Sequence, residues 1–596
     1  MAKLQVWAPR VTKMEIELRG QRIPMDALPE GWKNFESDLL SHGVDYTLWL
    51  DDAGPFQDPR SAYQPEGYAG PSRYVDHARF AWTDAFWQPP RWDDAVVYEM
   101  HVGTFTPDGT FDAAIAKLDY LVGLGVTYIE LLPVAQFAGH RGWGYDGVYL
   151  YAPQHSYGGP DGLKRFVDAC HQRGLAVLLD AVYNHIGPRG NHLPHFAPYF
   201  TDHYHTPWGV AVNVDGPDSD EVRRFFIDNA TMWLRDYHID GLRLDATDTI
   251  VDNSALPFLE QLTSQVAALE ASLGRKFIVV GESSLNDPRL VRPVQKCGLG
   301  LNAQWNEDFH HCVHTLLTGE QGGYYLDYGS LGDLARVLGA GFCYDNRYSR
   351  YRRHHFGRPA VGVSGNQFVG CLQNHDQVGN RPAGERIGHL VPIERLKVGA
   401  AVTLLSPFVP MLFQGEEWNA SSPFLYFIDF ADPELSFAVL EGRRNQAVNF
   451  GLNASDVIDP QSEGAWKRSQ LQWHERQQGE HRVVLDWYQR LIRLRRAHTD
   501  FRAGPIHPSC VAYDERARWL RLRRGSKLVL FNFSDHPTGV PLGTRAPFEL
   551  LLSSVEIAPD KKSAAGEFQL PAWGVAVLAL QGELDDMPPL ELTEGD

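Results

Sequence analysis

Apolar and polar residues alternate in short runs near both ends of the chain, which is the pattern of half-buried β-strands. Such runs are Leu4–Pro9, Lys13–Leu18, Asp45–Leu50, Arg518–Leu522 and Lys527–Phe533. Turn residues separate them. We expect a small immunoglobulin-like, carbohydrate-binding-like β-sandwich over residues 1–90 and a second β-sandwich over residues 505–582.

The middle of the chain, residues 91–504, alternates apolar runs with stretches of helical spacing such as Leu163, Phe166, Val167 and Cys170. The apolar runs that we expect as strands are Val96–His101, Val126–Leu132, Leu175–Asp180, Asp240–Asp245, Phe277–Glu282, Leu301–Trp305, Phe368–Leu372 and Val409–Gln414. Continuously apolar strands are typical of parallel sheets that are buried on both faces. The fold class is therefore α/β.

This pattern favours a (β/α)8 TIM barrel with inserted loops over a doubly wound sheet. Polar chemistry recurs at the C-terminal ends of many of the expected strands, and a TIM barrel uses all of these ends for its active site. A doubly wound sheet binds its ligand at one switch point instead.

One expected strand, Asp240–Asp245, carries opposite charges on one face. Leu242 and Leu244 point to one side and Arg243 and Asp245 to the other, because strand side chains alternate. A neighbouring cation lowers the pKa of a carboxyl by about 1–3 units, which suits a carboxylate nucleophile. For an isolated pair of this kind a structural ion pair is the more ordinary interpretation.

Other strand ends carry further reactive side chains. They are Asp180, Asn184, His185, Glu282, Asn374, His375, Asp376 and Gln377. We expect these groups to meet at the C-terminal mouth of the barrel. Burial after an apolar strand raises the pKa of a carboxyl such as Glu282. One ionised and one protonated carboxyl are what the hydrolysis of a glycosidic bond requires.

Composition narrows the possible partners and the location. The net charge of −19 argues against a nucleic-acid partner, which needs a basic surface. No apolar run approaches the roughly 20 residues of a membrane-spanning helix, and residues 1–9 lack the apolar core of a secretion signal. The six cysteines form no C-x-x-C motif, as in reduced cytoplasmic proteins. Residues 583–596 are expected to be a disordered acidic tail.

Four segments resemble the conserved segments of the α-amylase superfamily of glycoside hydrolases, in the same order and spacing. They are Asp180–His185, Gly241–Asp245, Val280–Glu282 and Asn374–Asp376. Within that superfamily the chain is most similar to the maltooligosyltrehalose trehalohydrolases, over nearly its whole length. That likeness rests on His101–Thr106, Trp143–Val148, Tyr199–Thr201, Thr206–Gly209, Gln377–Arg381, Gln414–Trp418 and Glu441–Arg444. Glycogen branching enzymes share the N-terminal sandwich and are the nearest alternative.

The resemblance implies a retaining double displacement. Asp245 would be the nucleophile, Glu282 the general acid and base, and Asp376 the stabiliser of the transition state. Arg243 would orient Asp245, and Tyr145 would stack on the sugar that is cleaved. The implied substrate-binding residues are Arg243, His185, His375, Tyr145, Asp146, Trp208, Asp308 and Gln377.

The resemblance also implies the substrate and the partners. The bond cleaved would be the α-1,4 bond between the terminal trehalose and the chain of a maltooligosyltrehalose. Related α-1,4-glucans are further candidates, and a maltooligosyltrehalose synthase is the implied functional partner in trehalose biosynthesis. We expect a cytoplasmic monomer without cofactor or metal.

Several alternatives stay open at this point. Trp208 has a core position as its alternative, and Asp308 an exposed loop. Asn184 has calcium ligation as its alternative role, as in some superfamily members. Thr247–Thr249 departs from relatives, which often carry an apolar residue and then a histidine there. A non-catalytic glucan-binding protein is the alternative of another class, although the intact carboxyl groups argue against it.

Overall fold

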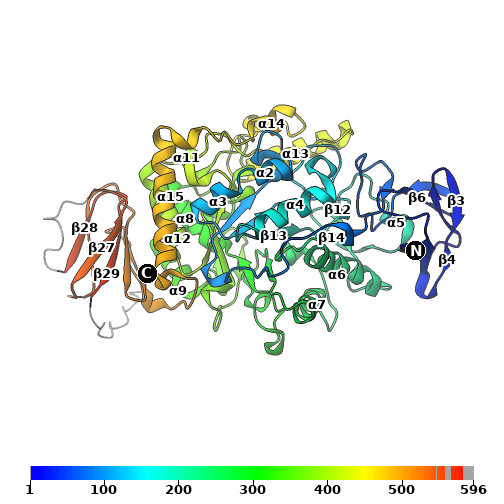
Figure 1. The fold of residues 1–596 in the computed structure, drawn as a ribbon. Helices are drawn as coiled ribbons and strands as arrows, with labels where there is room; N and C mark the ends of the chain where they lie inside the picture. Colours follow the sequence, from blue (N-terminus) through cyan, green and yellow to red (C-terminus); the bar gives the residue numbers. More distant parts are fainter. Residues whose placement is uncertain (1, 545, 557–565, 582–596) are drawn as a thin grey trace.

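The computed structural model describes residues 2–544, 546–556 and 566–581 (Figure 1). Its centre is a closed barrel of eight parallel strands. In barrel order these are β9 (Val97–Met100), β10 (Tyr128–Leu131), β13 (Ala176–Ala181), β16 (Gly241–Leu244), β17 (Ile278–Gly281), β18 (Ala303–Trp305), β21 (Phe368–Cys371) and β22 (Val409–Phe413). The sheet closes because β9 pairs with both β10 and β22. The expected barrel is therefore confirmed, and the doubly wound alternative was wrong.

The barrel strands are buried on both faces, as their apolar sequences predict. Val97 and Leu178 belong to the cluster of side chains that fills the barrel. Leu242 and Leu244 point outwards into the large core that the helices cover. Arg243, between these two leucines, consequently points into the barrel.

Helices surround the barrel and also form part of its loops. The principal ones are α4 (Gly159–His171), α6 (Ser219–Asp236), α7 (Phe258–Leu273), α8 (Glu307–Thr318), α9 (Leu331–Ala340), α12 (Ile393–Leu405), α13 (Pro433–Asn449) and α15 (Gly479–Ala497). Among the described residues, none of the helices combines the length and the apolar character needed to cross a membrane.

The N-terminal region is built from two antiparallel sheets. One consists of β1 (Ala2–Trp7), β5 (Trp32–Ser37) and β4 (Asp26–Ala27). The other consists of β3 (Gln21–Pro24), β2 (Met14–Leu18), β6 (Asp45–Leu50), β7 (Ala53–Phe56) and β8 (Ser72–Arg73). In β2 and β6 every second residue is buried, which is why their sequences alternate.

The C-terminal region is also β-rich and lies on the opposite side of the barrel from the N-terminal sheets (Figure 1). Its larger sheet contains β23 (Val511–Asp514), β24 (Trp519–Arg524), β25 (Lys527–Asn532), β29 (Val575–Leu580) and β27 (Phe548–Ser553). A second sheet pairs β26 (Thr538–Pro541) with β28 (Glu567–Leu570). The expected acidic tail, residues 583–596, lies outside the described residues.

Candidate active site

Arg243 connects the carboxyl groups at three neighbouring strand ends. Its Nη1 donates to both oxygens of Asp180, at 2.9 and 2.8 Å, and to Oδ1 of Asp245 at 2.8 Å. Its Nη2 donates to Oε2 of Glu282 at 2.7 Å. The register explains this geometry, since Asp180 lies beside Arg243 in the parallel pair of β13 and β16. The guanidinium also lies 4.0 Å from the centre of the Trp305 ring and is completely buried.

The turn after Asp245 brings the chain close to Glu282. Ala246 adopts a left-handed conformation with φ 38° and ψ 52°, which is unusual for a residue with a Cβ. Its backbone N–H donates to Oε2 of Glu282 at 2.8 Å, and the N–H of Thr247 donates to the backbone oxygen of Glu282 at 2.9 Å. Strained backbone of this kind is retained where the surrounding contacts fix it, often at functional sites.

Glu282 is held so that its two oxygens differ. Oε2 accepts from Arg243 and Ala246, whereas Oε1 has no hydrogen-bond partner among the described residues. Burial raises the pKa of Glu282 well above its usual value, although the charge of Arg243 acts in the opposite direction. The proton of the neutral acid therefore belongs on Oε1.

His375, at the start of the short helix α10 (His375–Gly379), is held by Glu99 of β9. Its Nδ1 lies 2.6 Å from Oε1 of Glu99, and its backbone N–H donates to Oε2 at 2.9 Å. Burial alone lowers the pKa of His375. The charges of Asp376 and Glu99 outweigh burial and raise that pKa to about 9. His375 is consequently an imidazolium at neutral pH.

Tyr145 bridges the two charged groups. Its hydroxyl donates to Oδ2 of Asp180 at 2.6 Å and lies 2.8 Å from Nε2 of His375. Because the single hydroxyl proton is given to Asp180, the tyrosine oxygen accepts the Nε2 proton of His375. The two rings stack with centroids 5.1 Å apart. In the neighbouring residue, burial raises the pKa of the Asp146 carboxyl to about 6.

His185 and Trp208 form a stacked pair at the edge of the site. The rings lie 4.6 Å apart with 4° between their planes. Trp208 lies in the turn between β14 (Phe200–Thr206) and β15 (Gly209–Val212) and is 50% exposed, so the core alternative was wrong. Nε2 of His185 bonds to the backbone oxygen of Tyr145 at 2.9 Å. Nδ1 of His185 and both side-chain polar atoms of Asn184 are buried without a partner among the described residues.

Asp376 lies on the open side of the site. Its side chain is 36% exposed, and its Oδ1 lies 3.5 Å from Nε2 of His375. The next residue, Gln377, uses Oε1 to accept the backbone N–H of Asn374 at 3.1 Å. Asn374 in turn accepts the backbone N–H of Asp376 at 2.9 Å, and this cap fixes the turn that carries both residues.

The expectation for Asp308 needs correction. Asp308 is not on an exposed loop, because it lies buried in the first turn of α8. Its oxygens accept hydrogen bonds from Asn286, Tyr328, Cys343 and Tyr344. These four donors occupy the carboxylate, so its geometry favours a structural role over the sugar-binding role that we expected.

The preceding residue, Glu307, was not among our candidates but faces the site. Burial raises the pKa of Glu307 to about 7, with further contributions from the charge of Asp248 and, more weakly, of Asp376. Asp248 itself accepts a hydrogen bond from Ser284 at 2.8 Å. Asp248 belongs to the segment Thr247–Thr249, where the chain differs from its relatives. It therefore places a second carboxyl group opposite Glu307. The position of Glu307, directly after the sixth barrel strand, was the signal that could have identified it.

The described residues contain no group of three or more His, Cys, Asp or Glu side chains placed to hold a metal ion. The arrangement instead offers one guanidinium, one imidazolium and several carboxyl groups around an opening. These are groups for acid–base chemistry on a neutral, hydroxyl-rich molecule.

Comparisons with known proteins agree with this chemistry. The model of the alpha amylase catalytic domain matches residues 72–196. A malto-oligosyltrehalose trehalohydrolase from Rhizobium sp. (strain M-11) is 43% identical over 585 residues, 97% of each chain. The enzyme of that name from Arthrobacter ramosus is 45% identical over 545 residues, 90% of this chain and 94% of the relative.

The chain belongs to the malto-oligosyltrehalose trehalohydrolase family. It is accordingly a glycoside hydrolase of the alpha-amylase superfamily. Among solved structures, a Salmonella typhimurium protein provisionally named as an alpha amylase superposes with a TM-score of 0.88 at 38% identity and covers 97% of both chains. That solved structure therefore shares this arrangement of barrel and β-rich ends.

Proposed function

We propose that this chain releases trehalose from the end of a maltooligosyltrehalose by hydrolysing the α-1,4 bond next to the trehalose. The observation that carries the proposal is the shared contact of Arg243 with Asp245 and Glu282. It holds a carboxylate and a carboxylic acid on neighbouring strands at one opening. The family to which the chain belongs supplies the substrate, since its members are named for this reaction.

The first step is attack by Asp245. Its Oδ1 is engaged by Arg243, so Oδ2 is the oxygen that bonds to the anomeric carbon. The glycosidic bond breaks, and the departing trehalose oxygen takes the proton from Oε1 of Glu282. Asp376 lies on the open side of the site, where a carboxylate stabilises the positive charge that develops on the sugar.

The second step is hydrolysis of the glycosyl-enzyme. Glu282, now ionised, takes a proton from water, and the water oxygen bonds to the anomeric carbon as Asp245 departs. Two displacements retain the α configuration. Arg243 keeps Asp245 oriented in both steps, because its contacts with Asp180 and Glu282 hold the guanidinium in place.

The remaining residues bind the sugar. The buried Nδ1 of His185, which has no partner among the described residues, accepts a hydrogen bond from a sugar hydroxyl group, and His375 places its positive charge beside the sugar. Tyr145 and Trp208 present aromatic faces, which suit the apolar faces of pyranose rings. Asp146 and Gln377 flank these groups. The same chemistry extends to related α-1,4-glucans, and a maltooligosyltrehalose synthase would supply the substrate.

The test is product analysis with maltotriosyltrehalose beside plain maltopentaose. The expected products from the first are trehalose and maltotriose, with the maltotriose released as its α-anomer. New branches in amylose, without release of trehalose, would overturn the proposal in favour of a branching enzyme.

A further inference from the structure

A cavity of about 510 Å³ lies outside the barrel, between α3 (Leu118–Leu124) and the start of α15 (Figure 1). Small-molecule sites span roughly 300–1,000 Å³, so this volume is ample for one. Its aromatic and polar lining residues are Tyr120, Arg476, Gln477, Arg482, Asp486 and Gln489. None of them belongs to the candidate active site, so a ligand bound here does not occupy the position of the cleaved sugar.

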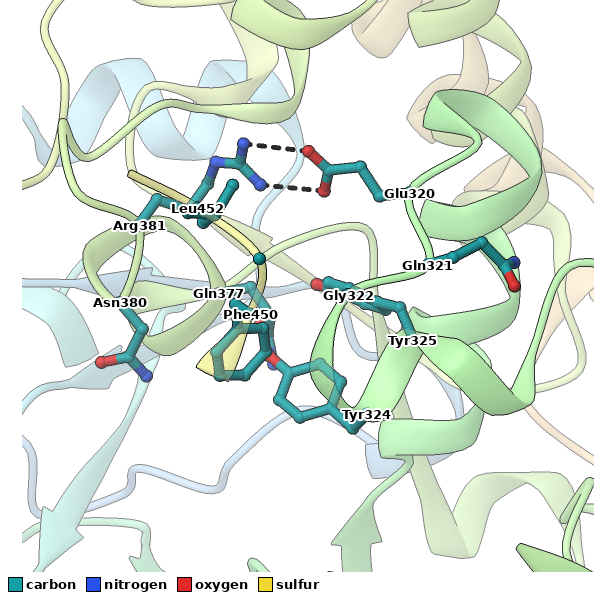
Figure 2. Close-up of a pocket in the computed structure, with 11 residues that line it drawn as sticks. Glu320, Gln321, Gly322, Tyr324, Tyr325, Gln377, Asn380, Arg381, Phe450 and Leu452 are labelled. Carbon is teal, nitrogen blue, oxygen red and sulfur yellow. Dashed lines mark hydrogen bonds and ion pairs between the residues drawn. The ribbon is translucent and has the colours of Figure 1, made fainter. Parts of the chain in front are cut away.

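Two arginines of this cavity, Arg476 and Arg482, have no carboxylate partner among the described residues. The cavity at the barrel mouth differs in this respect. There, both terminal nitrogens of Arg381 donate to Glu320, at 2.9 and 3.0 Å (Figure 2). An ion pair of that kind compensates its own charge, whereas the guanidinium groups of Arg476 and Arg482 stay available to an anion.

Aromatic rings hold the guanidinium of Arg476 in place. Its Cζ lies 4.8 Å from the centre of the Tyr120 ring and 5.3 Å from that of Trp473. Tyr120 is itself fixed, because its hydroxyl donates to Oε1 of Glu417 at 3.0 Å. Nη1 of Arg476 is buried and has no hydrogen-bond partner among the described residues. Buried donors normally have an acceptor, so this nitrogen indicates a ligand that carries an acceptor oxygen.

The charges that line the cavity favour an anion. Arg476 and Arg482 carry positive charge, and Asp486 is the one carboxylate among the lining residues. The helix α15 begins at Gly479, between Gln477 and Arg482, and its first turn has no side-chain cap. A helix N-terminus adds partial positive charge and unpaired N–H groups. The exposed Glu480 in this turn offsets part of that charge, and the two guanidinium groups remain in excess.

Amide groups border the rest of the cavity. The side chains of Gln477 and Gln489 have no hydrogen bond among the described residues. A phosphate group, which matches the fork of a guanidinium, fills only a small part of about 510 Å³. The remaining space suits a group with several hydroxyls, because a hydroxyl both donates and accepts, as an amide does.

We propose that this cavity is a binding site for a sugar phosphate. Arg476 and Arg482 hold the phosphate monoester, and Gln477 and Gln489 bond to the hydroxyl groups of the sugar. Maltooligosyltrehalose carries no charge, so the ligand is neither the substrate nor a product of the proposed reaction. The site is therefore additional to the barrel mouth, and it does not depend on the proposed function.

The experiment is calorimetric titration of the full chain with glucose 6-phosphate, with glucose and inorganic phosphate titrated separately. Arg482→Gln removes an exposed arginine of the cavity, and Arg496→Gln removes an exposed arginine of α15 that does not line it. We expect the Kd of glucose 6-phosphate to rise roughly tenfold in Arg482→Gln, through loss of a charge-assisted hydrogen bond, and to stay unchanged in Arg496→Gln. Arg476→Gln should weaken binding by at least as much.

A further variant should change the affinity in the opposite direction. Asp486→Asn removes the negative charge from the cavity wall, so the Kd of glucose 6-phosphate should fall about threefold, as expected for a partly exposed charge. A tighter complex cannot result from a damaged fold. An unchanged or higher Kd in Asp486→Asn would contradict the placement of the phosphate.

Other outcomes decide against the inference. If glucose 6-phosphate does not bind to wild type, or binds equally well to Arg476→Gln and Arg482→Gln, the cavity is not its site. If inorganic phosphate binds as tightly as glucose 6-phosphate, the cavity does not recognise the sugar. If glucose binds as tightly, the arginines do not select a phosphate. Because no hydrolysis is measured, failure of the proposed function leaves this test unaffected.

Discussion

Two groups of buried carboxyls lie at the same mouth of the barrel. Asp245 and Glu282 follow β16 and β17, and Glu416 and Glu417 follow β22. Burial raises the pKa of Glu282 well above its usual value, that of Glu416 to about 8 and that of Glu417 to about 7. By burial and pKa alone, the Glu416–Glu417 pair would qualify as an active site equally well.

The partners of the two groups differ. Glu416 accepts from the hydroxyl of Tyr488 at 2.9 Å. Glu417 accepts from Tyr98 at 3.2 Å and from Tyr120 at 3.0 Å. Both carboxyls are closed off, with residue exposures of 1% and 0%, whereas the Glu282 side chain is 16% exposed. A perturbed pKa therefore indicates a reaction site only where an oxygen also remains open to a ligand.

The largest effect is expected for Glu282→Gln. This substitution removes the transferable proton but preserves the size of the side chain, so hydrolysis of maltotriosyltrehalose should fall by about 10²–10⁴-fold. The melting temperature should change little. A loss of less than tenfold would contradict the role of Glu282 as the general acid.

Tyr145→Phe should have the next largest effect. It removes the hydroxyl between Asp180 and His375 and leaves the imidazolium without its acceptor. Hydrogen bonds to charged groups contribute about 1.5–3 kcal/mol, so kcat/KM should fall about 10–100-fold. Tyr488→Phe is the matched control, because it removes a hydroxyl from Glu416 instead. Equal losses of kcat/KM in Tyr145→Phe and Tyr488→Phe would show that the two groups of carboxyls do not differ in their role.

Glu416→Ala should affect stability rather than rate. It leaves the hydroxyl of Tyr488 buried without its acceptor, which costs about 1–3 kcal/mol, and it adds a cavity. Thermal unfolding should show this loss, while kcat per folded molecule stays within about twofold of wild type. A selective fall in kcat would instead place Glu416 in the reaction.

Glu416→Gln should give the smallest change of all near pH 5 and a marked pH dependence above it. The folded pKa of about 8 exceeds the ordinary value of 4.5, so the folded wild type retains a proton that the unfolded chain loses between these values. Wild-type stability therefore falls as pH rises through this window. An amide has no such proton. The variant should match wild type near pH 5, within about 0.5 kcal/mol, and become progressively the more stable towards pH 8. If the difference in melting temperature between the variant and wild type were the same at every pH, this prediction would be contradicted.

The sequence was sufficient for the barrel and for most of the charged centre. Apolar runs marked the strands, and parallel strands bring their C-terminal ends together, so Asp245, Glu282 and Asp376 could be placed at one mouth. The link from Arg243 to Asp180 and Glu282 depends on the register between strands. That register is a property of three dimensions, and no local pattern encodes it.

The position of an acidic residue after a barrel strand could not distinguish structural from reactive carboxyl groups. Glu307 and Glu416 both follow barrel strands, yet only Glu307 faces Asp248 and Asp376. Asp308 looked exposed because its donors, the backbone groups of Cys343 and Tyr344, lie 35 and 36 positions further along the chain. Contacts between residues far apart in sequence decide whether such an acid is structural or reactive.

The sharing of Arg243 by three carboxyls also bears on how such a site decays in evolution. Loss of Asp245 or Glu282 leaves the guanidinium with two partners, and the fold survives without activity. Loss of Arg243 first would leave three acids buried without compensation, and breaking a buried pair typically costs about 3–5 kcal/mol. A descendant that keeps the fold and abandons catalysis should therefore lose a carboxyl group before the arginine.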